Sequence, residues 1–311
     1  MIPNVSIITP AYNRAHTLPR VWNSLCSQTE QNFQWIVVDD GSTDNTKEVI
    51  SGFNDPRIVY VYQDNAGCNG ARNRGDQEIK AEFVVYLDSD DEFFNTGSLT
   101  DMLHAIRATR PEIAWVSFTC VDEHGQKVSH LEVDQMEANY LDHVCRQKFW
   151  GELFNIYRSD VRAISSWPSY RGFQSLRHLR IARQRPTLMI NRPARIYYRQ
   201  HGDNLSSASA TLSRAASMVE ATTECIEEHK SAWLNHCPSQ FGKYSFHKSV
   251  YLALSGPIYL ALPSLFHALR YGKWDIRRKV VFLFLAGIVP LSLRKKLFLW
   301  RDTWRNRLAR K

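Results

Sequence analysis

Residues 35–44 read Trp-Ile-Val-Val-Asp-Asp-Gly-Ser-Thr-Asp, an apolar run that ends abruptly in acidic and turn-forming residues. Comparable runs lie at residues 5–9, 58–62 and 83–87, with helix-sized segments between them. The runs are apolar along their length rather than alternating, which is typical of strands buried on both faces of a parallel sheet. Because repeated strand–helix–strand units are right-handed and build layered folds, the sequence predicts an α/β fold with a mainly parallel sheet flanked by helices.

The later part of the chain predicts two more strands and then a helical region. The strands are expected at residues 114–118 and 194–199. Residues 211–235 carry apolar side chains at helical spacing. We therefore expect one α/β domain at residues 1–210, followed by a helical region at residues 211–311.

Positive charge is concentrated at the end of the chain. Although the whole chain has a net charge of +8, residues 270–311 hold thirteen Lys or Arg against two Asp, so the remainder is slightly acidic. This distribution argues against a nucleic-acid binder, which would be basic throughout, and favours contact with an anionic surface.

Two apolar stretches, at residues 250–266 and 280–293, accompany this charge. Both are shorter than the roughly 20 residues that a membrane-spanning helix needs. They are compatible with a transmembrane span, with interfacial or re-entrant helices, or with a buried helical subdomain that has a basic surface. We expect the interfacial arrangement, a membrane-peripheral region. Because the N-terminus runs directly into a strand-like segment without a signal-like leader, we expect a cytoplasmic protein on the inner face of the cell membrane.

Several common site motifs are absent from the sequence. No G-x-G-x-x-G follows the first expected strand, and there is no G-x-x-x-x-G-K-[ST], no G-x-S-x-G and no H-E-x-x-H. None of the six cysteines lies in a Cys/His cluster with zinc spacing. These absences argue against dinucleotide binding, Walker-type phosphate binding, a hydrolase elbow and a zinc centre.

Polar clusters follow three of the expected strands, at residues 9–14, 39–44 and 88–91. In an open parallel sheet, ligands bind beyond the carboxyl ends of the strands, so these clusters are expected to converge on one crevice. The three carboxylates of Asp88-Ser89-Asp90-Asp91 repel one another. Such a cluster favours a divalent cation with oxygen ligands, Mn²⁺ or Mg²⁺, and a solvated acidic turn is the alternative.

A glycine-rich segment at residues 65–75, Asn-Ala-Gly-Cys-Asn-Gly-Ala-Arg-Asn-Arg-Gly, opens an expected helix. Its two arginines, Arg72 and Arg74, lie near the start of that helix, where backbone N–H groups and positive charge suit an anionic ligand. The alternative is a plain helix cap with exposed arginines.

Together these segments resemble the family-2 glycosyltransferases of the GT-A, Rossmann-like fold. The resemblance covers about residues 3–210. The matching segments, in the family's order, are VSIITPAYNR (5–14), VVDDGSTDNT (37–46), NAGCNGARNRG (65–75), FVVYLDSDDEF (83–93) and YYRQHGDNLS (197–206). The resemblance implies transfer of a sugar from a nucleoside diphosphate with inversion. A metal would neutralise the leaving diphosphate, and a carboxylate would deprotonate the acceptor hydroxyl.

The resemblance also implies roles for particular residues. Pro10, Ala11 and Tyr12 would lie against the base and ribose, and Asp40 would accept a hydrogen bond from the base. Asp88-Ser89-Asp90 resembles the family's D-x-D motif. The residues expected to bind the nucleotide sugar are Pro10, Ala11, Tyr12, Asp40, Gly67, Arg72, Asn73, Asp88 and Asp90. The residues expected to hold Mn²⁺ or Mg²⁺ are Asp90, Asp91 and His201.

One segment departs from the family pattern. The family places a Glu-Asp pair at the start of a helix, with an Arg about five residues later, where this chain has Gln174, Ser175 and Arg180. Between residues 161 and 202 there are nine Arg and no Asp or Glu. Three explanations compete: His178, one helical turn after Gln174, is the base; the acceptor is anionic, held by the arginines, and supplies its own base; or the site is degenerate.

The sequence therefore predicts a hexosyl- or N-acetylhexosaminyl-transferase that uses a nucleotide sugar, expected to be a UDP-sugar, and a glycan or lipid-linked acceptor. The alternative is a catalytically degenerate subunit that binds a nucleotide sugar or glycan within a membrane-associated assembly. Nucleotidyl transfer is a third hypothesis. It usually requires a Gly-rich basic loop after the first strand, and residues 10–14 are not such a loop.

Overall fold

The fold is known from a computed structural model. The structure describes residues 2–145, 148–170, 173–198, 208–277, 279–280, 290–292, 295–296 and 298. The chain forms two compact units, the first made of residues 1–169 and 174–200, the second of residues 170–173 and 201–311. The domain boundary expected at residue 210 lies slightly further along the chain than this division.

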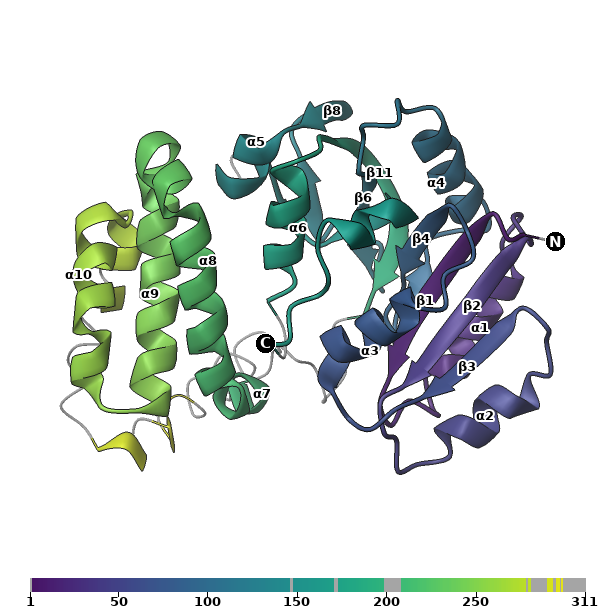
Figure 1. Cartoon of the computed structure of the whole chain (residues 1–311), viewed down its shortest axis with the longest axis horizontal. Coiled ribbons are helices and arrows are strands. Elements are labelled where there is room, and N and C mark those ends of the chain that lie inside the picture. The colour runs from purple at the N-terminus through teal and green to yellow at the C-terminus, as the bar shows by residue number, and fades with distance from the viewer. Residues whose placement is uncertain are drawn as a thin grey trace. The chain divides into compact units, whose positions relative to one another are not determined.

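The first unit is built on a nine-stranded sheet (Figure 1). In spatial order its strands are β3 (Ile58–Tyr62), β2 (Phe33–Asp39), β1 (Val5–Ala11), β4 (Phe83–Tyr86), β10 (Leu153–Arg158), β6 (Trp115–Asp122), β11 (Thr187–Tyr197) and β5 (Glu92–Phe93), and β8 (Gln135–Ala138) pairs with β11. A separate small sheet pairs β7 (Ser129–Leu131) with β9 (Phe149–Gly151).

The direction of the strands differs between the two halves of the large sheet. Strands β3, β2, β1 and β4 are all parallel, as predicted. Strand β10 is antiparallel to both of its neighbours, β4 and β6. The short strands β5 and β8 are antiparallel to β11 as well. The predicted α/β fold is confirmed, and the sheet is mixed because β10, β5 and β8, which were not predicted, enter it in the opposite direction.

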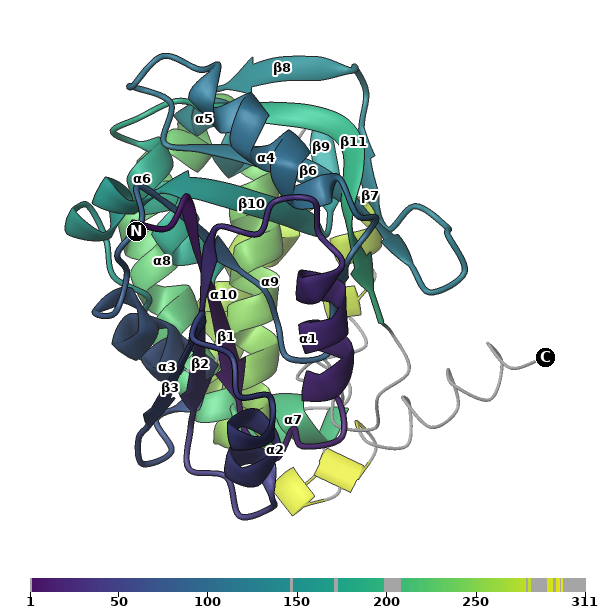
Figure 2. The same ribbon diagram turned by 90° about the vertical axis from the view of Figure 1, so that its right-hand side faces the viewer.

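Helices cover both faces of this sheet. The helices of the first unit are α1 (Leu18–Cys26), α2 (Thr46–Gly52), α3 (Gly67–Asp76), α4 (Ser98–Arg107), α5 (Tyr140–Cys145), the 3₁₀ turn η1 (Ser159–Ala163) and α6 (Ser175–Ala182). Adjacent residues of a strand point to opposite faces, so Ile7 packs with α1 and α4, whereas Ile8 packs in the cluster that contains α3 and α6 residues. Figure 2 shows α1 and α3 on opposite sides of β1 and β2.

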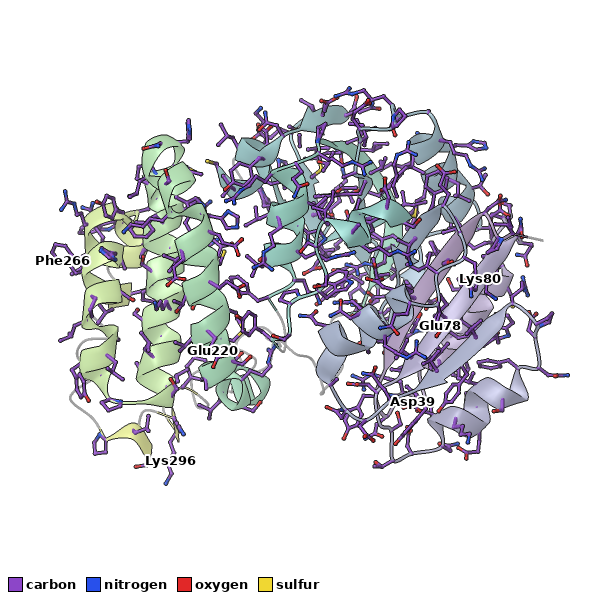
Figure 3. The ribbon with its side chains drawn as sticks, viewed as in Figure 1. Asp39, Glu78, Lys80, Glu220, Phe266 and Lys296 are labelled. Carbon is purple, nitrogen blue, oxygen red and sulfur yellow. The ribbon has the colours of Figure 1, made fainter. Side chains whose placement is uncertain are left out.

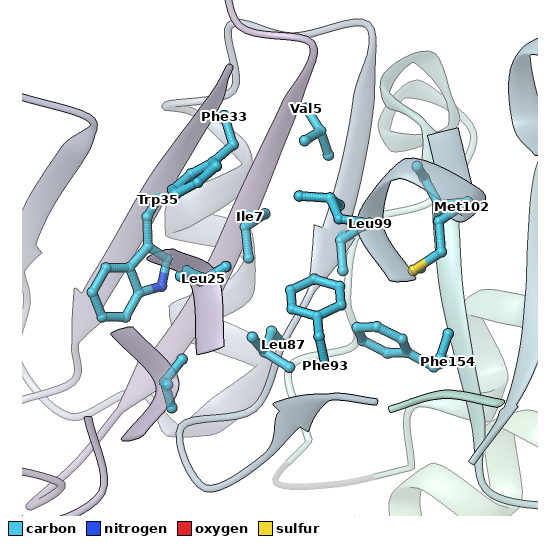
Figure 4. Packing of buried hydrophobic residues seen from close by; sticks show 14 of the residues in the cluster. Val5, Ile7, Leu25, Phe33, Trp35, Leu87, Phe93, Leu99, Met102 and Phe154 are labelled. Atoms are coloured by element: carbon cyan, nitrogen blue, oxygen red, sulfur yellow. The ribbon is translucent and has the colours of Figure 1, made fainter. Parts of the chain in front are cut away.

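The core beneath α1 and α4 is rich in aromatic rings (Figure 4). Trp35 is fully buried, stacks on Trp22 with ring centroids 5.3 Å apart, and donates its indole N–H to the hydroxyl of Thr9 at 2.9 Å. Phe93 and Phe154 meet edge to face at 5.5 Å. This contact joins the segment after β4 to β10, so the core spans both halves of the sheet.

The second unit is helical over the residues that the structure describes. Its elements are α7 (Ala208–Ser213), α8 (Ala215–His236), α9 (Pro238–Ser255), the 3₁₀ turn η2 (Ile258–Ala261) and α10 (Leu262–Tyr271). The apolar stretch at residues 250–266 is divided, because Gly256-Pro257 ends α9. The stretch at residues 280–293 lies mostly outside the described residues. No described helix combines the length and the apolar character needed to cross a membrane.

Gly75 sets how closely α3 approaches the sheet. A Cβ atom added there would stand 2.7 Å from Ile8 Cγ2 and 3.3 Å from Val38 Cγ2. We predict that Gly75→Ala lowers the free energy of unfolding by roughly 1–3 kcal/mol, measured by urea denaturation, because the core must shift to admit one methyl group.

The matched control for Gly75→Ala is Gly52→Ala. A Cβ atom at Gly52 would meet nothing within 4 Å, so this substitution is expected to be neutral or to stabilise the protein by up to about 1 kcal/mol. Equal responses of the two variants would contradict a packing role for Gly75.

Candidate active site

The polar segments singled out in the sequence leave the sheet at one edge. In the parallel register, Ala11 of β1 pairs with Asp39 of β2, and Ile8 pairs with Tyr86 of β4. The segments that follow these strands therefore begin side by side, at the carboxyl ends of the strands. Figure 3 marks Asp39 at this end of β2.

The turn after β1 is fastened to the turn after β2. Asn13, with a left-handed φ of 55°, donates its backbone N–H to the Ser42 hydroxyl at 2.9 Å. Its side-chain oxygen accepts from the backbone N–H of Thr43 at 2.8 Å. Pro10 and Ala11 are buried within β1, and the Tyr12 side chain is exposed at its end. An aromatic ring is thus presented at the edge where a nucleotide base was expected.

Asp40 organises the loop that leads into α3. Its side chain is buried, and Oδ1 accepts hydrogen bonds from Gln63 Nε2 at 2.6 Å and from the backbone N–H of Ala66 at 2.8 Å. Oδ2 accepts from the backbone N–H of Gly67 at 2.8 Å. A carboxylate at the N-terminus of a helix satisfies N–H groups that have no partner within the helix. In this structure the carboxylate expected to meet a base holds the glycine-rich loop in place.

Arg72 and Asp88 form an ion pair beside this loop. Arg72 is 3% exposed, and its Nη2 donates to Asp88 Oδ1 at 2.6 Å. The guanidinium lies over the ring of Trp167 at 4.8 Å. Asn73 bonds the backbone of Trp167 twice, at 2.8 and 2.9 Å, so it positions the ring on which Arg72 lies.

Arg72 also has donor atoms that this contact does not use. Among the described residues, its Nε and Nη1 are buried and have no hydrogen-bond partner. Buried donors without an acceptor are costly, and a guanidinium satisfies them best with an oxyanion. Nearby, burial raises the pKa of the Cys68 thiol to about 11.

Arg195 of β11 contacts two carboxylates of the acidic turn, residues 88–91, and a third carboxylate from another segment. Its Nη1 lies 3.0 Å from Asp91 Oδ2 and 3.9 Å from Asp88 Oδ2. Its Nη2 lies 3.3 Å from Glu152 Oε2. Asp91 is buried, and this burial raises the pKa of its carboxyl group, while the Arg195 charge acts in the opposite direction. Asp91, expected to be a metal ligand, therefore has a guanidinium as its partner.

The acidic turn is held from α1 as well. Arg20 donates from Nη2 to the backbone carbonyl of Asp90 and places Nε 3.2 Å from Glu92 Oε1. Asp90 itself is half-buried. In the described part of the chain, no three His, Cys, Asp or Glu side chains are grouped to hold a metal ion. His201, the third expected ligand, lies outside the described residues.

The helix that carries the departure from the family pattern is α6. Ser175 is its first residue, Gln174 precedes it as N-cap, and Arg180 lies in its last turn. His178 lies among the rings of Trp115, Tyr157 and Trp167, with centroids 5.5–5.9 Å away.

The contacts of His178 link it to the acidic turn only through other side chains. His178 Nε2 lies 2.5 Å from the hydroxyl of Tyr157, and the His178 ring lies 5.9 Å from that of Trp167. Trp167 in turn lies under the guanidinium of Arg72, which is bonded to Asp88. His178 as the base stays a prediction.

Most of the described arginines between residues 161 and 202 have partners within the chain. Arg177 is fully buried beside Asp76 at 3.7 Å. Arg185 pairs with Asp160 at 2.9 Å, and Arg192 pairs with Asp101 at 3.1 Å. These pairs weaken the explanation in which this segment holds an anionic acceptor.

Sequence reasoning missed three residues of this edge: Arg195, Glu152 and Trp167. Of these three residues, only Arg195 could have been found from the sequence. It is a charged residue within an expected strand, and a charged side chain is rarely buried without a partner.

Comparison with known proteins identifies the family. The family model described as glycosyl transferase family 2 matches residues 6–177, more than half of the chain. The chain therefore belongs to glycosyl transferase family 2, as the sequence motifs predicted.

Two curated relatives illustrate the range of similarity. An uncharacterized glycosyltransferase of Rickettsia bellii is 32% identical over 136 residues, which cover 43% of this chain and 20% of that protein. The GalNAc(5)-diNAcBac-PP-undecaprenol beta-1,3-glucosyltransferase of Campylobacter jejuni is 31% identical over 170 residues, covering 51% of this chain and 53% of that protein. The chain thus matches only about a fifth to a half of the length of these relatives.

Solved structures support the fold. S. aureus TarS in complex with UDP-GlcNAc aligns with a TM-score of 0.58 and 17% identity, covering 91% of this chain and 92% of that one. The mannosyltransferase PcManGT from Pyrobaculum calidifontis, in complex with GDP-Man and Mn²⁺, aligns with a TM-score of 0.54 and 17% identity, covering 98% and 88%. At this identity the likeness shows a common GT-A-like fold.

The Asp91–Arg195 pair gives a stability prediction. Asp91→Asn leaves a buried guanidinium without its nearest counter-charge, so we expect the free energy of unfolding to fall by about 3 kcal/mol, measured by chemical denaturation. The control is Asp101→Asn, which removes an exposed pair with Arg192 and is expected to cost less than about 1 kcal/mol. Similar losses in both variants would refute the buried pair as a structural anchor.

Proposed function

We propose that this protein transfers a sugar from a nucleotide sugar, with inversion, to a glycan or lipid-linked acceptor. The observation that carries the proposal is the buried Arg72, whose Nε and Nη1 have no partner among the described residues, beside Asp88 at the edge of the parallel strands. A diphosphate would supply the oxygen atoms that these donors require. We propose UDP as the nucleotide.

The proposal includes a divalent cation, Mn²⁺ or Mg²⁺. Asp88 and Asp90 offer hard carboxylate oxygens on one turn, which suit these ions together with diphosphate oxygens. We assign the cation to Asp90, the diphosphate and His201, while Asp91 holds the turn through Arg195. When bound, the cation would stabilise negative charge on the departing diphosphate.

The names of the relatives support parts of this proposal. TarS was solved with UDP-GlcNAc and with UDP, and PcManGT with GDP-Man and Mn²⁺. The Campylobacter jejuni enzyme is named for an undecaprenol-linked acceptor. These names favour a nucleoside diphosphate sugar and a lipid-linked glycan, and they make both UDP and GDP the nucleotides to test.

A second candidate function is binding of a nucleotide sugar or glycan without turnover. The observation that favours it is Gln174-Ser175 at the start of α6, where the family has a Glu-Asp pair. The two functions share the donor site and differ in whether the bound sugar is transferred.

Calorimetric titration of the purified chain with UDP and with GDP, each with and without Mn²⁺, tests the donor site. We expect one nucleotide to bind only with metal, and Asp90→Ala to abolish that binding. Arg72→Gln should weaken it about 10- to 100-fold, the range for a charged hydrogen bond. Asp101→Ala, at an exposed carboxylate of α4, should bind like the wild type. Absence of binding by both nucleotides would refute the donor site.

We also propose that the helical unit binds the inner face of the cell membrane from the cytoplasm. One side of η2 and α10 packs into the core of their own unit through Ala261, Leu265 and Ala268. The other side is apolar as well. The exposed apolar face consists of Tyr259, Leu260, Leu262, Phe266, Leu269 and Trp274. Phe266 is 60% exposed, and Figure 3 shows it on the side of α10 that is turned away from α9.

This exposed apolar face is bordered by positive charge. Arg270, Lys273 and Arg277 are exposed next to it. Apolar and aromatic side chains with basic neighbours are the composition of a helix that lies in the interface of an anionic bilayer. A monomer in water rarely exposes this many large apolar side chains within one short segment without a binding role.

Co-sedimentation with vesicles of phosphatidylcholine and phosphatidylglycerol tests this proposal. We expect binding that decreases when phosphatidylglycerol is omitted and when salt is raised, because each basic residue near the surface contributes about 1 kcal/mol. The double variant Phe266→Ser, Trp274→Ser should lose most of the binding. Trp150→Ser, at an exposed tryptophan of the first unit, should not. Equal binding by all three proteins would refute the α10 face as the membrane contact.

A further inference from the structure

We infer that Glu152 is the general base of the transfer reaction, the group that takes the proton from the attacking acceptor hydroxyl. The inference rests on the proposed function. It gives the role of general base to Glu152, because the start of α6 has Gln174 and Ser175 and no carboxylate.

Strand register places Glu152 at the same edge as the acidic turn. β10 pairs antiparallel with β4, Ile156 opposite Val85, so the start of β10 lies beside the residues that follow β4. On the other side, Leu153 pairs with Thr119 of β6, and the next residue of β6, Cys120, pairs with Arg195 of β11. Continued by one residue, the register sets Glu152 level with Arg195.

One guanidinium joins Glu152 to the donor side. Arg195 reaches Glu152 Oε2 at 3.3 Å through Nη2, and Asp91 and Asp88 through Nη1. Arg195 is 6% exposed and packs on the rings of Phe154 and Tyr197 at 5.4 and 5.3 Å, so its position is fixed by the core. It therefore orients the Glu152 carboxylate relative to Asp88.

Glu152 differs from the other carboxylates of this edge in its access to solvent. Its side chain is 51% exposed, whereas that of Asp91 is 2% exposed. Asp88 is bonded to Arg72, and Glu92 contacts Arg20 and accepts a hydrogen bond from Tyr198 at 2.6 Å. Glu152 is the most exposed of these four carboxylates, ahead of Asp88 at 37%, and Arg195 holds it in place.

The chemical step is a single displacement. The acceptor oxygen forms a bond to the anomeric carbon of the sugar as the bond from that carbon to the diphosphate oxygen breaks. The electron pair of the breaking bond leaves with the nucleoside diphosphate. The hydroxyl proton passes to the Glu152 carboxylate, and the protonated carboxyl then loses it to solvent.

The test uses water in place of the unidentified acceptor. Donor hydrolysis is followed as release of nucleoside diphosphate from UDP-GlcNAc, UDP-glucose and GDP-mannose with Mn²⁺, and donor affinity is measured by calorimetry. We expect Glu152→Gln to lower the hydrolysis rate about 10²- to 10⁴-fold, with donor affinity unchanged within about threefold. The matched control is Glu137→Gln, an exposed glutamate paired with Arg110 at 2.7 Å, which should hydrolyse like the wild type.

Rescue separates a base from a structural residue. Sodium formate added to Glu152→Ala should restore part of the rate, because a small carboxylate can occupy the place of the missing one. Loss of donor affinity in Glu152→Gln without formate rescue of Glu152→Ala would overturn the base role. So would an unchanged rate in Glu152→Gln, or a loss confined to His178→Gln. Failure of the wild type to bind any of the three donors would overturn the proposed function itself, and this inference with it.

Discussion

The buried guanidinium of Arg195 is the constraint on which the polar edge of the first unit depends. Arg195 lies on β11, late in the chain, and forms ion pairs with carboxylates from the segment after β4 and from the start of β10. A buried cation is tolerated only with counter-charges in good geometry, so its presence fixes the relative positions of these segments. Asp91, Asp88 and Glu152 are thereby ordered around one centre, although the separations along the chain reach more than a hundred residues.

The parallel half of the sheet was predictable because each of its strands carries a strong local signal. The apolar runs around Val37 and Val85 end in acids and turn formers, and the structure has strands at these places. Strand β10 lacks the continuous apolar run that marks the parallel strands, because Asn155 interrupts it: Phe154 and Ile156 are buried, while Leu153 and Asn155 are only half-buried. Its pairing with β4 is a tertiary fact that no local pattern encodes.

The sequence predicted which segments of the candidate site meet, but it did not predict the partners of the individual side chains. Segments that end parallel strands must meet at one edge, so the meeting of Asp40, Arg72 and Asp88 followed from topology. The hydrogen-bond partners of these residues did not follow from topology, because a hydrogen bond depends on the direction of the side chain. Asp40 turns to the N–H groups of Ala66 and Gly67, and Asp91 turns inward to Arg195. Glu152 carries no motif, and only the register of an antiparallel strand brings it to this place.

The antiparallel entry of β10 has a consequence for how the family can diversify. The side of the edge proposed to bind the donor is encoded before residue 94, in parallel strands whose loops are hydrogen-bonded to one another. The opposite side is encoded after residue 114, and the small β7–β9 sheet precedes β10 in that region. Insertions or exchanges between β6 and β10 can therefore remodel the Glu152 side of this edge while the loops encoded before residue 94 keep their register. A lineage can in this way alter one side of the candidate site by changing one contiguous stretch of its gene.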